Sequence, residues 1–385
     1  MAFRSLVLLC MAGLIAASAA PAHGQTPSPT SSLELFGVLD LGVELVNHVG
    51  ASSARLVRMP SLTGTVSSRL GVRVREDLGG GLAALAVLEM GLAPDTGTQL
   101  QGGRGWGRQS FVGLSTPWGS FSLGRQYTML FWSLLDADIL GPNIYGTGSL
   151  DAGLPNARSD NTLGWRGNFG GWTLGATTSF GRDVVNAGPS PAGSNCPGES
   201  GLDARACRGW SLLAKFDTPR GGLALADDRQ HGRALSSLPG GAVDAVFGGL
   251  DSSAKVDRRV SFNGYLRLGT TKFGAGLVRR SNEGDALKPD SRLWYVGVAQ
   301  PLNPLLSLDA AWVALRYPHL GGYDASLLAV RATYSLSRRT ALHGQWGHIR
   351  NGAASALSVS AGAAGSNPAA GRAQAALHVG VRHSF

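Results

Sequence analysis

Hydrophobic and polar residues alternate with a period of two along most of the chain. In residues 33–46, leucines and valines occupy alternate positions, and Glu34, Asp40 and Glu44 lie between them. Successive side chains of a β-strand point to opposite faces of a sheet, so this period predicts strands with one apolar and one polar face. The alternation recurs in residues 66–75 and 372–385. The sequence therefore predicts an all-β fold.

About sixteen such segments follow one another, an even number that is typical of bacterial outer-membrane barrels. Most span about ten residues or more, the length that a tilted strand needs to cross a bilayer. We expect strands at residues 33–46, 66–76, 81–92, 105–116, 117–126, 160–168, 171–181, 207–217, 221–230, 256–269, 271–282, 290–301, 305–317, 323–337, 340–351 and 372–385.

The connections between these strands alternate in length. Tight turns are expected at residues 77–81, 117–119, 169–171, 219–222 and 337–339. Long connections rich in Gly, Ser, Pro and Ala are expected at residues 47–65, 127–159, 182–206, 231–255 and 352–371. Outer-membrane barrels keep short turns on the periplasmic side and long loops outside, so the two sets predict the two ends of a barrel.

Alternation alone also fits a soluble β-sandwich, whose apolar face packs in a core. The strand length and the arginine pairs and triples favour a transmembrane antiparallel barrel, because charge is costly against lipid and tolerated in a water-filled lumen. All strands are needed to close such a sheet, which predicts a single domain.

The N-terminus has the three-part layout of a secretory signal peptide. Arg4 gives a basic start, residues 6–20 are apolar and small, and Ala22-His23-Gly24 is a small-x-small cleavage site. A membrane-spanning helix is the alternative, but it needs about 20 apolar residues. We expect residues 1–24 to be the signal peptide and residues 25–385 to be one barrel domain.

Composition narrows the class further. Glycine is abundant, with 56 residues, and 34 basic against 25 acidic residues give a net charge of +9. The arginines are scattered over strands without a basic helix or aromatic platform, so nucleic acid is not an expected partner. Cys196 and Cys207 flank a Gly/Pro/Ser-rich stretch and suit a disulfide in an oxidising compartment; two unpaired thiols are the alternative.

Several short motifs follow one another along the chain, each weak when taken alone. They are LELFGVLD at 33–40, SRLGVR at 68–73, EDLGGGL at 76–82, FVGLS at 111–115, GSFSLGRQ at 119–126, SRRTAL at 337–342 and VGVRHSF at 379–385. In this order, ending in Phe385, they resemble the general trimeric porins of Gram-negative bacteria, of the betaproteobacterial type. The match covers nearly the whole mature chain.

The resemblance implies a sixteen-stranded barrel in the outer membrane, a homotrimer, and a third loop that folds inward and narrows the pore. That loop is expected at residues 127–157 and is unusually apolar at residues 129–135. The implied partners are small hydrophilic solutes and ions, lipopolysaccharide and other outer-membrane lipid, and the barrel-assembly machinery, which reads a terminal signal that Phe385 would supply. No cofactor, metal site or catalytic residue is implied.

A pore of this kind acts through size exclusion and an electrostatic field. By motif position, the family's basic wall corresponds to Arg69, Arg108 and Arg158, and its acidic side to Asp136 or Asp138. These aspartates have a second interpretation, in which they only attach the loop to the barrel wall. Further lumen charges are expected at Arg73, Arg75 and Asp40.

The resulting hypothesis is a passive, anion-leaning channel. One alternative is a substrate-specific channel of the same architecture. Another is a barrel enzyme such as a lipase or protease, although Gly-x-Ser-x-Gly, His-Glu-x-x-His and paired Cys-x-x-Cys motifs do not occur. A third is a structural or adhesive barrel without conductance.

Overall fold

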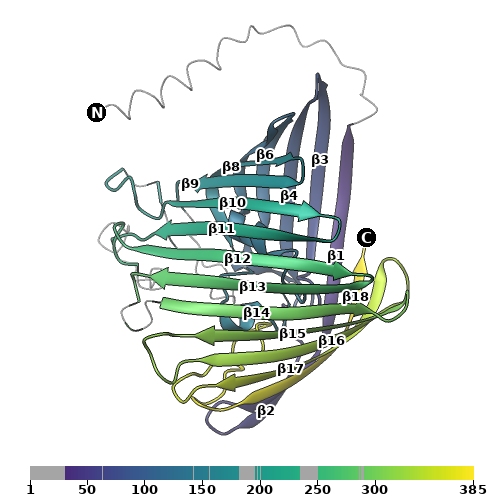
Figure 1. Ribbon diagram of the computed structural model, residues 1–385, viewed down its shortest axis with the longest axis vertical. Coiled ribbons are helices and arrows are strands. Elements are labelled where there is room, and N and C mark those ends of the chain that lie inside the picture. Colours follow the sequence, from purple (N-terminus) through teal and green to yellow (C-terminus); the bar gives the residue numbers. More distant parts are fainter. Residues whose placement is uncertain are drawn as a thin grey trace.

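The computed structural model describes residues 31–385 except 63, 142, 156, 182–195, 197, 200, 235–249, 286, 288 and 289. The expected signal peptide, residues 1–24, lies outside the described residues. Figure 1 shows a single twisted sheet wrapped around an interior, with β10–β14 facing the viewer. Their left ends carry long connections and their right ends short turns.

Sixteen antiparallel strands close this sheet into a barrel. Closure comes from β1, which pairs with β18 along one edge and with β3 along the other. The barrel strands are β1 (Ser32–Val49), β3 (Arg69–Gly79), β4 (Leu82–Ala93), β6 (Gln109–Thr116), β7 (Gly119–Tyr127), β8 (Arg158–Phe169), β9 (Trp172–Ser179), β10 (Gly209–Thr218), β11 (Gly221–His231), β12 (Val256–Leu268), β13 (Thr271–Asn282), β14 (Asp290–Pro301), β15 (Leu306–Arg316), β16 (Ala325–Ser335), β17 (Thr340–Asn351) and β18 (Gln374–Ser384).

The connections contain two short strands and three short helices. β2 (Ala54–Arg58) pairs with the far end of β1, and β5 (Thr98–Gln99) pairs with the end of β4. The helices are α2 (Leu100–Gly103), α3 (Met129–Leu134) and α4 (Thr147–Leu150). None of the helices in the described residues is long and apolar enough to cross a membrane.

The period of two separates the two faces of the sheet. Leu33 and Leu35 are 74% and 60% exposed on the outer face of β1, whereas Asp40 and Glu44, of the opposite parity, are fully buried inside. Large apolar side chains are likewise exposed on the outer face of the other strands. An apolar exterior around a polar interior is the reverse of a soluble sandwich and is what a lipid-facing barrel requires.

The last residue takes part in closing the barrel. The backbone N–H groups of Gly37 and Phe385 each donate to the other's carbonyl oxygen, at 3.0 Å in both cases. The Phe385 ring lies over Gly37, where an added Cβ would collide with it. The terminal aromatic residue therefore covers the seam between the first and last strands.

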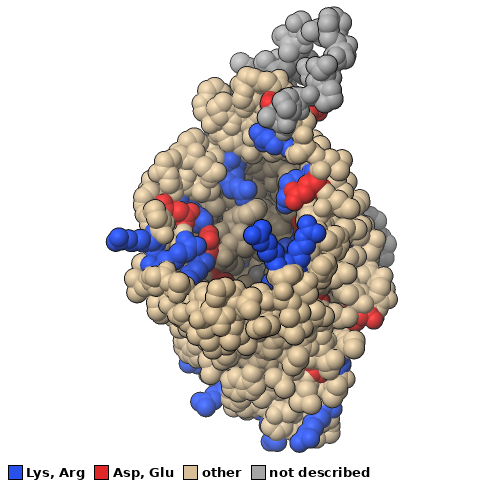
Figure 2. Space-filling model, turned by 90° about the vertical axis from the view of Figure 1, so that its right-hand side faces the viewer, with Lys and Arg blue, Asp and Glu red and all other residues tan. Residues whose placement is uncertain are grey.

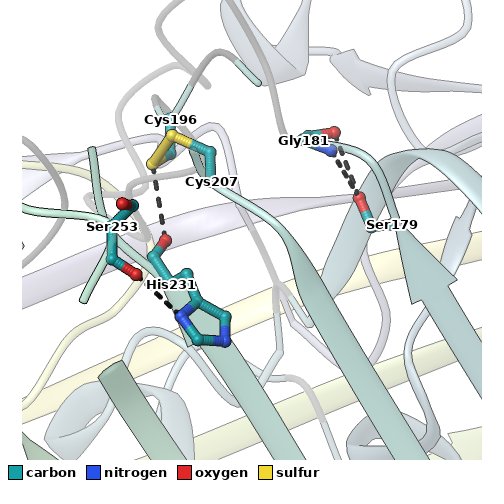
Figure 3. The surroundings of a disulfide bond; sticks show 6 residues. All are labelled: Ser179, Gly181, Cys196, Cys207, His231 and Ser253. Carbon is teal, nitrogen blue, oxygen red and sulfur yellow. Dashed lines mark hydrogen bonds between the residues drawn. A yellow bond between two sulfur atoms is a disulfide. The ribbon is translucent and has the colours of Figure 1, made fainter. Parts of the chain in front are cut away.

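A disulfide joins Cys196 and Cys207 in the connection between β9 and β10. Figure 3 shows it beside His231, the last residue of β11, and near Ser253, whose carbonyl oxygen lies 2.9 Å from Nδ1 of His231. The bridge closes a ring within this connection, and two contacts place the ring against the end of β11. The backbone N–H of Cys207 donates to the Gly232 carbonyl oxygen at 2.9 Å, and Cys196 Sγ lies 3.7 Å from the His231 carbonyl oxygen.

Candidate pore constriction

The connection between β7 and β8, residues 128–157, turns into the barrel and carries α3 and α4. α3 contacts β9, β10, β11 and β12, and α4 contacts β15. β9 is the neighbour of β8, but β10, β11, β12 and β15 lie farther around the wall, so the connection runs along the inner surface instead of projecting outward. This is the inward loop that the family resemblance implied.

Apolar packing holds the loop against one half of the inner wall. Loop residues such as Leu130, Leu134 and Ile144 form one buried cluster with wall residues such as Tyr295 and Leu327. Other wall members come from β13 to β18: Val278, Leu293, Ala311, Val313, Leu315, Ala325, Ala329, Ile349 and Ala376. The apolarity of residues 129–135 has two outlets on the wall. Leu130 and Leu134 belong to this cluster, and Met129 and Trp132 pack against Leu213, Ala224 and Ala226 of β10 and β11.

Close approach also requires glycine on the wall. A Cβ added to Gly274 of β13 would collide with the carbonyl oxygen of Ala137, and one added to Gly297 of β14 would press against Ile139. The loop backbone therefore lies directly on these two strands.

Charged side chains fix the loop at three further points. Lys215 of β10 donates to Asp136 Oδ2 at 2.6 Å. Arg259 of β12 donates to both carboxylate oxygens of Asp151, at 3.0 and 3.2 Å. Arg331 of β16 donates to the Leu140 carbonyl oxygen at 3.1 Å.

The loop carboxylates differ in their surroundings. Burial would raise the pKa of Asp151, but the charge of Arg259 outweighs it and holds the pKa at about 2. Burial raises the pKa of Asp138, against the opposing effect of a hydrogen bond from Thr147 Oγ1 at 2.9 Å. Asp136, attached to Lys215, remains 36% exposed at its side chain. Of the two aspartates expected at the acidic side, Asp138 is thus bonded within the loop, and Asp136 is the one that reaches water.

The three predicted arginines meet in one network on the opposite part of the wall. Arg108 Nε lies 2.6 Å and Arg69 Nε 3.5 Å from Glu89 Oε1. Arg108 Nη2 and Arg158 Nη2 donate to the Tyr127 hydroxyl at 2.7 and 2.9 Å. Glu89 and Tyr127 thereby hold guanidinium groups from three separate segments together.

These arginines differ in access to water. The side chain of Arg69 is 27% exposed, whereas Arg108 and Arg158 are buried. Arg108 has the parity of the outward residues of β6, but it precedes the strand and turns inward to Glu89. Arg73 and Arg75 share the face of Arg69 and are exposed, and Arg73 donates to Glu34 Oε2 at 2.7 Å. Arg69 is therefore the network's main contact with solvent, and Arg73 and Arg75 extend the basic surface.

Asp40 corrects one expectation. It faces inward, but it is fully buried, accepting hydrogen bonds from the backbone N and Oγ1 of Thr65 and lying 2.9 Å from His343 Nε2. The segment that carries Thr65 covers it. Asp40 therefore attaches a connection to the wall and does not line open water.

Sequence reasoning missed Glu89, Tyr127 and Arg259. Glu89 is a lone inward carboxylate in an otherwise apolar strand, which is a usable signal for a charge partner. Tyr127 and Arg259 carry no comparable signal, because their roles depend on the path of the loop.

Figure 2 looks at the end of the barrel that carries the short turns and shows a hollow bordered mainly by lysine and arginine side chains. The sequence profile of the Gram-negative porins matches residues 11–354. The chain belongs to the Gram-negative porin family. Its closed sixteen-stranded antiparallel barrel accords with that family.

Comparisons with individual porins agree. The chain is 29% identical over 393 residues to "Outer membrane porin protein 32" of Delftia acidovorans, covering 98% of this chain and 99% of that protein. It is 26% identical over 378 residues to an outer membrane porin protein of Bordetella pertussis, covering 89% of this chain and 94% of that protein. The solved "Anion-selective porin from Comamonas acidovorans" superposes with a TM-score of 0.72 at 21% identity, covering 92% of this chain and 100% of that one.

The porin is thus an integral protein of the Gram-negative outer membrane. Its closed, water-filled interior provides a passage for the passive diffusion of small hydrophilic solutes.

Proposed function

We propose that the porin prefers anions, and that Arg69, Arg108 and Arg158 supply this preference. The observation that carries the proposal is their shared network. Arg69 and Arg108 contact one carboxylate, that of Glu89, and Arg158 joins the same network through the Tyr127 hydroxyl, so positive charge is concentrated there. Arg73 and Arg75 add to it along the same face.

The location of this charge increases its effect. Protein walls of low dielectric constant reduce screening, so a charge beside a narrow water path acts more strongly than one in bulk water. On the loop side, the exposed carboxylate of Asp136 is partly neutralised by Lys215. Anions should therefore be enriched at this level of the channel, in keeping with the similar Comamonas porin, which is described as anion-selective.

The reversal potential across a KCl gradient in a planar bilayer tests this proposal. Arg69→Gln should shift it toward cations, and neutralising Arg69, Arg108 and Arg158 together should shift it further. Arg69→Lys is the matched control, because it keeps the charge. Raising the salt should weaken the preference, since the Debye length falls from about 10 Å at 0.1 M to about 3 Å at 1 M. Equal reversal potentials for the parent and the triple variant at low salt would contradict this assignment.

A substrate-specific channel of the same architecture is the second candidate. The aromatic stack of Tyr127 on Phe131, with ring centroids 3.8 Å apart, lies directly beside the arginines and would favour a flat anionic solute. Conductance or flux that saturates with one such solute, and not with chloride, would decide for this candidate.

We further propose a homotrimer of mature single-domain barrels, with Phe385 as the assembly signal. The family resemblance and the position of Phe385 on the closing seam support this. Deleting Phe385 should lower the amount of heat-modifiable trimer in the outer membrane, and unchanged amounts would contradict it.

We also propose that the chain acts as a channel and not as an enzyme. Hydrolysis assays on the pure protein with ester and peptide substrates test this. Turnover that is lost on replacing a serine or histidine would overturn it.

A further inference from the structure

Arg166 of β8 is an inward arginine that lies outside the network of Arg69, Arg108 and Arg158. It has the parity of Gly164, which is buried on the inner face of the strand. Cζ of Arg166 lies 3.8 Å from the centroid of the Trp132 ring in the inward loop. Within the described part of the chain, Arg166 forms no ion pair, and its side chain is only half-buried. Its charge is therefore available to a solute.

Aromatic side chains connect Arg166 with the arginine network. Cζ of Arg158 lies 4.6 Å from the centroid of the Tyr127 ring, and that ring meets Trp132 edge to face at 6.3 Å. Phe131 stacks on Tyr127 and meets Trp132 edge to face at 5.9 Å. Arg158 begins β8 at its loop end, whereas Arg166 lies near its short turn. A solute that leaves the network toward the short turns thus passes these rings before it reaches Arg166.

A small apolar recess opens in the inward loop beside the same rings. It has a volume of about 60 Å³, and its apolar lining comprises Phe131, Leu134, Leu135, Leu154 and Pro155. Leu135 is 42% exposed, so the rim of the recess is open to water. A water molecule in such a space needs two to four polar partners, which this lining does not supply. The recess therefore suits a hydrocarbon group better than water.

Polar groups at the recess and beside it set the orientation of such a solute. Asp138 also lines the recess, and its carboxylate accepts hydrogen bonds from Thr147 Oγ1 at 2.9 Å and from the backbone N of Gly141 at 3.3 Å. A second carboxylate is disfavoured next to this acidic group. Trp132 covers one face of the Arg166 guanidinium, which leaves the N–H donors at its edge for a carboxylate. The anionic end of the solute belongs at Arg166, and its apolar end belongs in the recess.

We propose that this part of the channel is a subsite for small carboxylates that carry an apolar ring. Arg166 binds the carboxylate, and the ring of the solute lies on Phe131 with its far edge in the recess. The subsite is preformed, because Trp132 packs against Leu213 and Ala224 of the wall, so little order has to be gained on binding. The inference rests on the proposed anion preference, and it adds selection by the apolar part of the solute.

Block of the chloride current through single channels of the full-length protein in a planar bilayer tests the proposal. The probe is 3-phenylpropionate, compared with propionate, which has the same charge and lacks the ring. In the parent, 3-phenylpropionate should block at a concentration about tenfold lower than propionate does, because its ring is partly buried. Arg166→Gln should raise the blocking concentration of 3-phenylpropionate about tenfold, because it removes the cation that holds the carboxylate.

A second variant tests the recess without altering charge. Leu135→Gln should weaken block by 3-phenylpropionate and leave block by propionate unchanged, and its exposed position makes folding insensitive to the change. Lys272→Gln is the matched control. It removes a cation that also lies over an aromatic ring, 4.9 Å from the Tyr265 centroid, but that does not line the recess, so block by 3-phenylpropionate should stay nearly constant. Heat-modifiability shows that each variant forms the barrel.

Equal block by the two acids in the parent would overturn the proposal. So would an unchanged ring preference in Leu135→Gln, or a loss in Lys272→Gln as large as that in Arg166→Gln, which would reduce the effect to total charge in the lumen. Reversal potentials in a KCl gradient keep the two proposals apart. A parent that prefers cations would contradict the proposed anion preference, whereas an anion-preferring parent that does not distinguish the two acids would contradict the subsite alone.

Discussion

The inner wall of the porin has two unlike halves. Beneath the inward loop, β13 to β17 present buried apolar residues such as Tyr295 and Leu327. The loop packs on them and forms one hydrophobic core with them. Across the interior, Arg69, Arg73 and Arg75 of β3 remain in contact with water. In both halves, the side chains that face the interior are those at every second position of a strand.

The difference shows how one sheet separates two tasks. The apolar half fixes the loop through the hydrophobic effect, which salt does not screen, whereas the basic half acts on ions through a field that salt screens. Changes in the first half should therefore alter stability and pore size, and changes in the second should alter ion preference at nearly constant stability.

The largest effect is expected from Leu327→Asp in the apolar half. Leu327 is fully buried against the loop, and a buried carboxylate without a partner costs several kcal/mol. The loop should detach, so single-channel conductance should rise and the barrel should unfold at a lower temperature. Leu327→Met, which nearly conserves volume, should cost less than about 1.5 kcal/mol. A Leu327→Asp variant with the parent's conductance and heat stability would contradict the packing role.

Asp151→Asn should have a smaller effect of the same kind. It removes the carboxylate bonded by Arg259, a loss of about 2 kcal/mol for a charge-assisted hydrogen bond, while Arg259 keeps Asp257 as a partner at 2.9 Å. Channel noise should increase as the loop moves.

This effect has a defined pH dependence. The pKa of Asp151 falls from 3.8 to about 2 on folding, so its contribution is present above about pH 4 and lost as pH falls from about 4 to about 2. The difference in stability between the parent and Asp151→Asn should therefore disappear over that window. A difference that stays constant down to about pH 2 would show that Arg259 does not hold the carboxylate in its charged form.

Glu89→Gln in the basic half should change ion preference in the opposite direction to Arg69→Gln. Without its carboxylate, the network gains one positive charge in excess, so the reversal potential should shift further toward anions. The expected size is a factor of a few in permeability ratio, since one charge at about 4 Å contributes about 1 kcal/mol in water. A shift toward cations would show that Glu89 only positions Arg69 and Arg108.

The smallest effect is expected from Arg73→Gln. The side chains of Arg73 and Glu34 are 53% and 54% exposed, and such ion pairs contribute about 0–1 kcal/mol. Unfolding temperature should stay constant, and the reversal potential should shift toward cations by less than in Arg69→Gln. A larger shift than that of Arg69→Gln would place the selective level of the channel nearer Arg73.

The strands could be predicted from the sequence because alternation is a local signal. The expected strand at residues 256–269 is observed as Val256–Leu268, and the turns follow with similar accuracy. The inward loop was predicted from the family resemblance alone. Its attachment could not be predicted, since Asp151 and Arg259 are far apart in the chain and meet only when the barrel is closed. The alternation also gave the wrong side for Arg108, because this residue precedes its strand and does not follow the strand's alternation.

The pairing of Val38 with Ser384 has a consequence for the timing of assembly. The first strand leaves the export channel earliest, yet its final partner is the last segment of the chain to arrive. Until then β1 and the growing edge both carry open hydrogen-bonding groups, which readily pair with other chains. Contacts so distant in sequence form slowly. Closure of the barrel therefore requires β18, and a chain that lacks this strand would keep the hydrogen-bonding groups of β1 and β17 unpaired along the open seam.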